Sequence, residues 1–112
     1  MYLHTIDIAH PPMSSDEAEA FLDETLRMVK ASSNLRVLKI IHGQGSAERP
    51  ARLKDVAKNW AYRNRSRLRA VVAGEEYQVF NATIQALRKE CGQEPDADLG
   101  AANAGITIVW IK

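Results

Sequence analysis

The chain has 112 residues, of which 46% are hydrophobic and 26% charged, and its formal net charge is +1. This length suits one domain with a single buried core, and such a balanced charge says nothing by itself about partners. The only cysteine, Cys91, excludes a framework of intrachain disulfides and is typical of a reducing compartment. No apolar run reaches the roughly 18 residues of a membrane span, and the first residues lack a signal-peptide pattern. We therefore expect a cytoplasmic protein without a membrane partner.

The first elements are a strand and a helix. Residues 2–9 carry β-branched residues in loose alternation and predict a strand, which the prolines of residues 10–13 end. Ser14 and Glu17 have the spacing of a capping box, so we expect a helix to begin near Ser15. Its buried stripe, at helical spacing, comprises Ala18, Phe21, Leu22, Thr25, Leu26 and Val29.

The second strand and helix flank a glycine loop. Residues 35–42 are apolar almost without alternation, which predicts a central strand covered on both faces. After the loop, Pro50 suits the first turn of a helix that ends between residues 62 and 64. The apolar stripe of this helix comprises Leu53, Val56, Ala57, Trp60 and Ala61.

The last part of the chain contains one further helix between two strands. We expect it to cover about residues 79–91 because Tyr77, Phe80, Ile84, Leu87 and Cys91 recur at helical spacing, with Gly92 as a left-handed C-terminal cap. The remaining elements are a strand over 67–73, a turn over 74–77, a polar loop over 93–104 and a last strand over 106–111. The predicted order is β-α-β-α-β-α-β, in one domain.

The glycine loop after the second strand is suited to an anion. Glycines allow close approach of a ligand to the backbone, and the first amides of a helix are unpaired donors. A basic block follows, with eight basic residues and one acid between Arg49 and Arg69, which is typical of a polyanion-binding surface or of a solvated helix face. The candidate nucleic-acid contacts are Gly43, Gln44, Gly45, Ser46, Arg49, Arg52 and Lys58.

His42 is the candidate acid or base, because an imidazole titrates near neutral pH. The alternative is a loop histidine hydrogen-bonded to the backbone. Asp7 and His10 complete the candidate catalytic set. Asp7 would orient a histidine or a nucleophile, or cap the next turn, and His10 would be a second acid or base or a solvated loop residue. We find no zinc-type cluster of cysteine and histidine, and no second carboxylate beside the loop.

Three stretches resemble the Smr (small MutS-related) domain. Residues 41–45, Ile-His-Gly-Gln-Gly, resemble the family's histidine/threonine-glycine-x-glycine signature, and residues 6–10, Ile-Asp-Ile-Ala-His, its leucine-aspartate-leucine-histidine motif. Residues 103–110 are similar to its small-residue loop and final strand. The resemblance implies an α/β two-layer sandwich with a four-stranded mixed sheet and two main helices, like the C-terminal domain of translation initiation factor three. It also implies nucleic-acid binding and, in several members, endonuclease activity, a hydrolase function, on RNA or branched DNA.

Two departures from the family pattern bear on this expectation. Two residues separate Asp7 from His10, where the family has one, and in a strand this slip changes the face. Either His10 turns back through the loop before Pro11, or Ala9 takes the place of the family histidine. In addition, the segment 74–100 inserts a helix that would modify a partner surface or cover a sheet edge.

We therefore expect a nucleic-acid-binding domain with endonuclease activity, in which no cofactor is obligatory because an RNA 2′-hydroxyl would attack. A divalent metal stays open as an addition. The alternatives are a binding module without chemistry and a protein-interaction module that uses the 74–100 insert.

Overall fold

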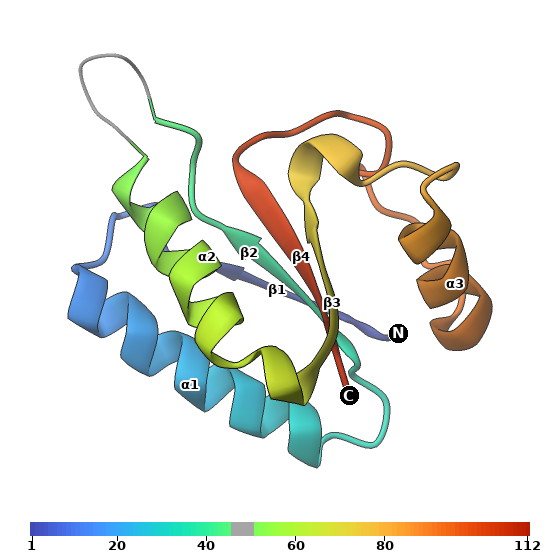
Figure 1. The fold of residues 1–112 in the computed structure, drawn as a ribbon, viewed down its shortest axis with the longest axis horizontal. Coiled ribbons are helices and arrows are strands. Elements are labelled where there is room, and N and C mark those ends of the chain that lie inside the picture. Colours follow the sequence, from blue (N-terminus) through green and yellow to red (C-terminus); the bar gives the residue numbers. More distant parts are fainter. Residues whose placement is uncertain (46–50) are drawn as a thin grey trace.

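The computed structural model describes residues 1–45 and 51–112. Its elements follow the predicted order, with two additional short 3-10 turns (Figure 1). They are β1 (Leu3–Asp7), α1 (Ser15–Ala31), β2 (Val37–Ile41), α2 (Arg52–Arg63), η1 (Arg65–Arg67), β3 (Leu68–Ala73), η2 (Gly74–Glu76), α3 (Ala82–Cys91) and β4 (Ile106–Ile111).

The four strands form one mixed sheet in the order β1-β2-β4-β3. β1 pairs parallel to β2, whereas β4 pairs antiparallel to both β2 and β3. The α/β fold with a four-stranded mixed sheet is therefore confirmed. β2 has a neighbour on each side, as its nearly continuous apolar sequence predicts.

Helices α1 and α2 cover one face of the sheet. The predicted capping box starts α1: the Ser14 hydroxyl accepts from the Glu17 amide at 3.1 Å, and the Glu17 carboxylate accepts from the Ser14 amide at 3.0 Å. The predicted stripes of both helices point to the sheet, with Phe21 and Val56 at the margin of the core. The buried members from the helices are Ala18, Leu22, Leu26, Val29, Leu53, Ala57, Trp60 and Ala61.

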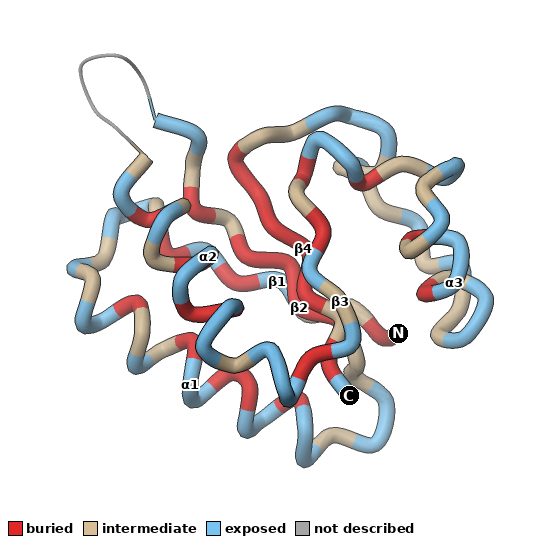
Figure 2. The backbone as a smooth tube through the Cα atoms, in the orientation of Figure 1, coloured by how far each residue is buried: buried red, intermediate tan, exposed pale blue. Residues whose placement is uncertain are grey.

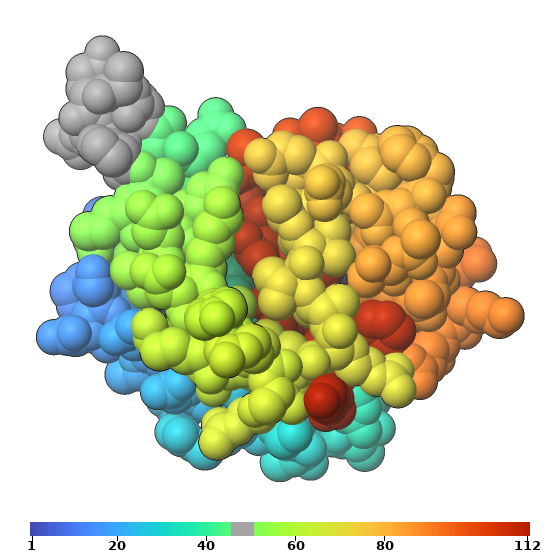
Figure 3. Space-filling model, viewed as in Figure 1, coloured from blue at the N-terminus to red at the C-terminus, as the bar shows by residue number. Residues whose placement is uncertain are grey.

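Helix α3 covers the opposite face, so the inserted segment adds a third layer to the two-layer sandwich. Ile84 and Leu87 of α3, together with Tyr77, form a second buried cluster with residues of three strands. Figure 2 shows the buried strands between α1 and α2 on one side and α3 on the other, and Figure 3 shows α2 and the α3 segment on either side of β3. The insert thus covers a face of the sheet, whereas the sequence suggested that it would cover a sheet edge or modify a partner surface.

The start and end of α3 differ from the sequence prediction. The helix begins at Ala82 because the Asn81 side chain caps it, accepting from the Ile84 amide at 3.1 Å. Phe80, which the spacing placed on the buried stripe, is 75% exposed. Gly92 ends the helix with φ +125° and ψ 171°, so it has a positive φ without the left-handed helical conformation.

No helix in residues 1–45 and 51–112 has both the length and the apolar character needed to cross a membrane.

Candidate functional site

Asp7, His10, His42 and the start of the glycine loop lie close together because β1 and β2 are parallel neighbours. Asp7 at the end of β1 pairs with Ile41 at the end of β2, and the Ile8 amide donates to the Ile41 carbonyl at 3.0 Å. The loops that follow both strands therefore lie side by side. With the start of α2 they form an open groove of about 480 Å³. Its lining consists of Ala9, His10, Pro12, His42, Gly45, Ala51, Arg52 and Leu53.

Asp7 holds the loop after β1 in a tight turn. Its Oδ1 accepts from the Ala9 amide at 2.8 Å and from the His10 amide at 3.1 Å. The same carboxylate lies 3.0 Å from Nδ1 of His10, whose side chain is 71% exposed. The extra residue between Asp7 and His10 is thus accommodated in a turn, and His10 folds back to Asp7. This is the first of the two arrangements expected from the sequence, in which His10 turns back through the loop before Pro11.

The electrostatics of this pair favour an oriented imidazole. Burial alone would raise the pKa of Asp7, but hydrogen bonds from Ala9 and His10 outweigh it and lower the pKa. Asp7 is therefore ionised at neutral pH and accepts from Nδ1–H of His10. In the neutral ring Nε2 is then the basic nitrogen.

His42 differs from His10 in that it is buried, with 3% exposure. Its Nδ1 lies 2.7 Å from the Gly43 carbonyl, and its Nε2 lies 2.8 Å from the Thr107 hydroxyl. A carbonyl only accepts, so Nδ1 carries the proton and the hydroxyl donates to Nε2. Burial lowers the pKa of His42, and the charges of Lys54 and Lys58 add to this effect. The geometry therefore matches the alternative of a backbone-bonded loop histidine and does not support direct proton transfer by His42.

The glycine loop adopts the backbone conformation that its residues permit. Gly43 has φ +76° and Gly45 has φ +73°, in the region that favours glycine. The Gly105 carbonyl accepts from the amides of His42 at 2.9 Å and Gly43 at 3.0 Å. A Cβ atom on Gly105 would lie 3.5 Å from the Gly43 Cα, so the two segments approach closely. Gln44 and Gly45 are exposed.

The predicted cations occupy different positions. Arg52 lines the groove and donates to the Ser15 hydroxyl and the Met13 carbonyl, each at 3.0 Å. Lys58 is exposed further along α2, outside the lining. Ser46 and Arg49, predicted as contacts, and Pro50, placed in the first helical turn, lie outside the described residues.

The start of α2 borders the groove through Ala51. This N-cap residue makes no side-chain hydrogen bond to the helix, because a methyl group has no acceptor. Among the described residues, Ala51 therefore supplies no side-chain cap to the first-turn amides of α2.

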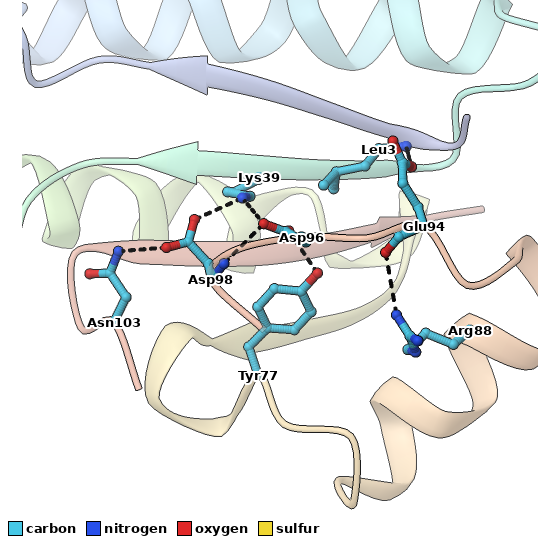
Figure 4. A network of polar contacts seen from close by, with 8 residues as sticks. All are labelled: Leu3, Lys39, Tyr77, Arg88, Glu94, Asp96, Asp98 and Asn103. Carbon is cyan, nitrogen blue, oxygen red and sulfur yellow. Dashed lines mark hydrogen bonds and ion pairs between the residues drawn. The ribbon is translucent and has the colours of Figure 1, made fainter. Parts of the chain in front are cut away.

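A buried polar network supports the loop from the other face of the sheet (Figure 4). Lys39 of β2 donates to Asp96 at 2.6 Å and to Asp98 at 2.7 Å. Asn103 donates to Asp98 at 3.1 Å and accepts from the Gly105 amide at 2.9 Å. The 93–104 segment is thus tied to β2, and its last residues place the Gly105 carbonyl against the glycine loop.

Sequence reasoning did not assign roles to Lys39, Asn103 or Thr107. Lys39 carried a signal, since a lysine inside an otherwise apolar, doubly covered strand requires buried carboxylates. Asn103 and Thr107 carried none, because their partners are remote in the sequence.

In the described parts of the chain, no three side chains of histidine, cysteine, aspartate or glutamate gather in an arrangement that would hold a metal ion. Asp7 and His10 alone would supply two ligands.

Comparison with known proteins establishes the fold. The structure is similar to the crystal structure of the Smr domain of Thermus thermophilus MutS2, with a TM-score of 0.55 and 17% sequence identity. The similarity covers 100% of this chain and 99% of that one. The sequence matches no protein-family model and no curated protein. The Smr-like fold expected from the motifs is therefore confirmed.

Proposed function

We propose that this chain is an Smr-like domain that binds nucleic acid in the groove between β1, β2 and α2 and cleaves RNA there. The observation that carries the proposal is the Asp7–His10 pair, an exposed imidazole held 3.0 Å from a carboxylate at the rim of that groove. The similarity of fold and of loop motifs to the Smr domain supports it.

The groove offers several phosphate contacts. The start of α2, where Ala51 provides no side-chain cap, would supply N–H donors at the positive end of the helix dipole. Arg52 adds a cation at the same place, and the exposed Gly45 admits the backbone of a ligand. Lys58 contributes charge at longer range.

Cleavage of RNA would proceed by proton transfer to His10. Its Nε2 would accept the proton of a ribose 2′-hydroxyl, and the 2′-oxygen would bond to phosphorus. The bond from phosphorus to the 5′-oxygen would break, and that oxygen would take a proton from water. The hydroxide left behind would take the proton from the His10 imidazolium. The products are a 2′,3′-cyclic phosphate and a 5′-hydroxyl, so the step needs no external oxidant, reductant or obligatory metal. Asp7 would stabilise the imidazolium formed.

In this proposal His42 is a positioning residue. Its imidazole links the Gly43 carbonyl to the Thr107 hydroxyl, which holds the glycine loop against β4. Its loss is expected to weaken binding and lower cleavage together. Loss of His10 is expected to lower cleavage alone.

The test is a cleavage assay on labelled single-stranded RNA and branched DNA, with binding measured in parallel. We expect His10→Ala and Asp7→Asn to lower cleavage by about 10²-fold or more, the range of general acid–base catalysis, with binding changed little. His42→Ala, in contrast, is expected to weaken binding. Runs with chelator and with added magnesium separate the metal-free mechanism from a metal-assisted one.

The outcomes discriminate between the functions. Cleavage that persists at the wild-type rate in His10→Ala contradicts the catalytic role of the pair. Salt-sensitive binding without cleavage under any condition identifies a binding module without chemistry.

We infer a second candidate function, a protein-interaction surface on the insert, from two exposed apolar side chains. Val79 is 58% exposed and Phe80 75% exposed at the segment before α3. Deleting residues 75–98 would not test this cleanly, because it removes Tyr77, Ile84 and Leu87 from the buried cluster. Substitution of Val79 and Phe80 by serine tests it: loss of a partner with nucleic-acid binding retained would support the interaction function.

A further inference from the structure

A second and larger groove, of about 590 Å³, lies between α3 and the sheet at the opposite end of β2. Its lining includes Tyr2, Arg36, Arg69, Glu90, Cys91 and Trp110. Arg36 immediately precedes β2, whereas His42 follows it. Arg36 and His42 flank the five residues of β2, and the six residue rises between them correspond to about 20 Å. We call this second groove the distal groove.

The distal groove contains a cation–π pair. The Arg69 guanidinium lies 4.9 Å from the centre of the Trp110 ring, and it also pairs with Glu90. Trp110 is only partly buried, in contrast to Trp60 at 1% exposure. A guanidinium over a partly exposed indole offers a platform on which a further planar ring can stack.

A fixed cation lies beside the platform. Arg36 is half-buried, and its Nη1 donates to the Ser32 carbonyl at 2.9 Å and to the Leu35 carbonyl. Its guanidinium is therefore held at the groove before any ligand arrives, which limits the entropy lost on binding. Unlike lysine, it offers several donors in one plane to a phosphate.

The surroundings of the groove are basic as well. The Lys112 amide donates to the Arg67 carbonyl, so these two cationic residues are neighbours. Lys112 lines the distal groove. Cations also occupy the last turns of α2 and α3, where they complement the helix dipoles. That explanation does not apply to Arg36 and Arg69, because neither is part of a helix.

We propose that the distal groove binds one unpaired nucleotide of a single-stranded nucleic acid, with the base on the Arg69–Trp110 platform and a phosphate at Arg36. A planar aromatic ring joined to an anion matches this combination of groups, and single-stranded nucleic acids are bound in this way by stacking and charge. Bases in a duplex are stacked on one another and would not reach the platform. The proposal goes beyond the function at the glycine loop, because it gives the domain a second contact on a separate surface.

The single cysteine and the partly exposed tryptophan make the distal groove directly measurable. Cys91 lines the groove and is half-buried. Burial raises the pKa of its thiol, so alkylation is followed at mildly alkaline pH, where more thiolate forms. We expect a saturating oligouridylate to slow alkylation of Cys91 and to quench tryptophan fluorescence, because a base would cover both side chains.

Arg69→Gln and Arg63→Gln form a matched pair of variants. Each arginine is exposed and pairs with one glutamate, Glu90 for Arg69 and Glu19 for Arg63, but only Arg69 lines the groove. We expect Arg69→Gln to weaken the interaction that protects Cys91 about tenfold, as for loss of one stacking contact, and Arg63→Gln to change it less than twofold. Equal weakening in both variants shows unspecific charge attraction and overturns the proposal.

Two further arms separate the remaining outcomes. If uridine monophosphate protects Cys91 to the same extent as the oligonucleotide does, the proposal that the groove binds single-stranded nucleic acid is overturned, because the groove would then hold a free nucleotide. Full binding of the oligonucleotide without protection of Cys91 also overturns it, and leaves the glycine-loop site intact. Arg52→Ala is expected to weaken overall binding while saturating oligonucleotide still protects Cys91, so failure at one groove is distinguishable from failure at the other.

Discussion

Replacement of Lys39 tests how the insert is attached to the sheet. The side chains of Lys39 and Asp96 are 8% and 5% exposed, and their charged atoms lie 2.6 Å apart. Lys39→Met would leave Asp96 buried without its cation, and Asp98 would lose the same partner. Removal of one member of a buried ion pair costs about 3–5 kcal/mol. We expect the lower part of this range, about 3 kcal/mol, since the Tyr77 hydroxyl still donates to Asp96 at 2.8 Å.

Urea unfolding at pH 7, followed by circular dichroism, measures this free energy. The matched control is Arg63→Met, which breaks an exposed pair with Glu19 and should cost less than about 1 kcal/mol. The triple variant Lys39→Met, Asp96→Asn, Asp98→Asn removes all three charges and should recover most of the loss. A loss below about 1 kcal/mol for Lys39→Met, or a triple variant no more stable than the single one, would refute the reasoning.

Three other predictions concern stability. Burial lowers the pKa of His42 below its ordinary value of 6.5. As the pH decreases through 6.5, the unfolded chain therefore binds a proton that the folded chain does not, and the free energy of unfolding decreases. His42→Gln should flatten this dependence in urea titrations between pH 7 and pH 5. Gly74→Ala would place its Cβ atom 1.8 Å from the Asn103 carbonyl oxygen and should lower the free energy of unfolding in urea by about 3 kcal/mol, whereas a loss below about 1 kcal/mol would contradict a close contact at this glycine. Ser14→Ala should lower the thermal midpoint through loss of about 1 kcal/mol, whereas an unchanged midpoint would contradict the role of the cap.

The sequence was informative about the fold wherever local chemistry and periodicity agreed. The capping box of Ser14 and Glu17, the stripe of α2 and the apolar run of β2 all predicted their elements. The predicted start of α3, at about residue 79, was wrong. Phe80 continued the helical spacing by chance, whereas the Asn81 side chain caps the helix and sets its first residue. The third layer was not foreseen, since amphipathic spacing shows that α3 buries one face but not which face of the sheet receives it.

The site was predicted less completely. Sequence motifs brought out Asp7, His10 and the glycine loop, and the parallel pairing of β1 with β2 places them around one groove. Their roles in function stay predictions. His42 is hydrogen-bonded to Thr107, which lies 65 positions away in the sequence. No local sequence pattern indicates such a partner, so the buried state of His42 could not be predicted. The accommodation of the extra residue before His10 depended on the Asp7 turn, which strand alternation alone does not describe.

The most direct test of the central claim is an NMR titration of the nitrogen-15-labelled chain with single-stranded RNA. We predict that the amide signals of His10, Gly43, Gln44, Gly45 and Arg52 shift in a saturable and salt-sensitive way. Shifts confined to α3 and its preceding segment, or no saturable shift in this groove at low salt, would contradict the account.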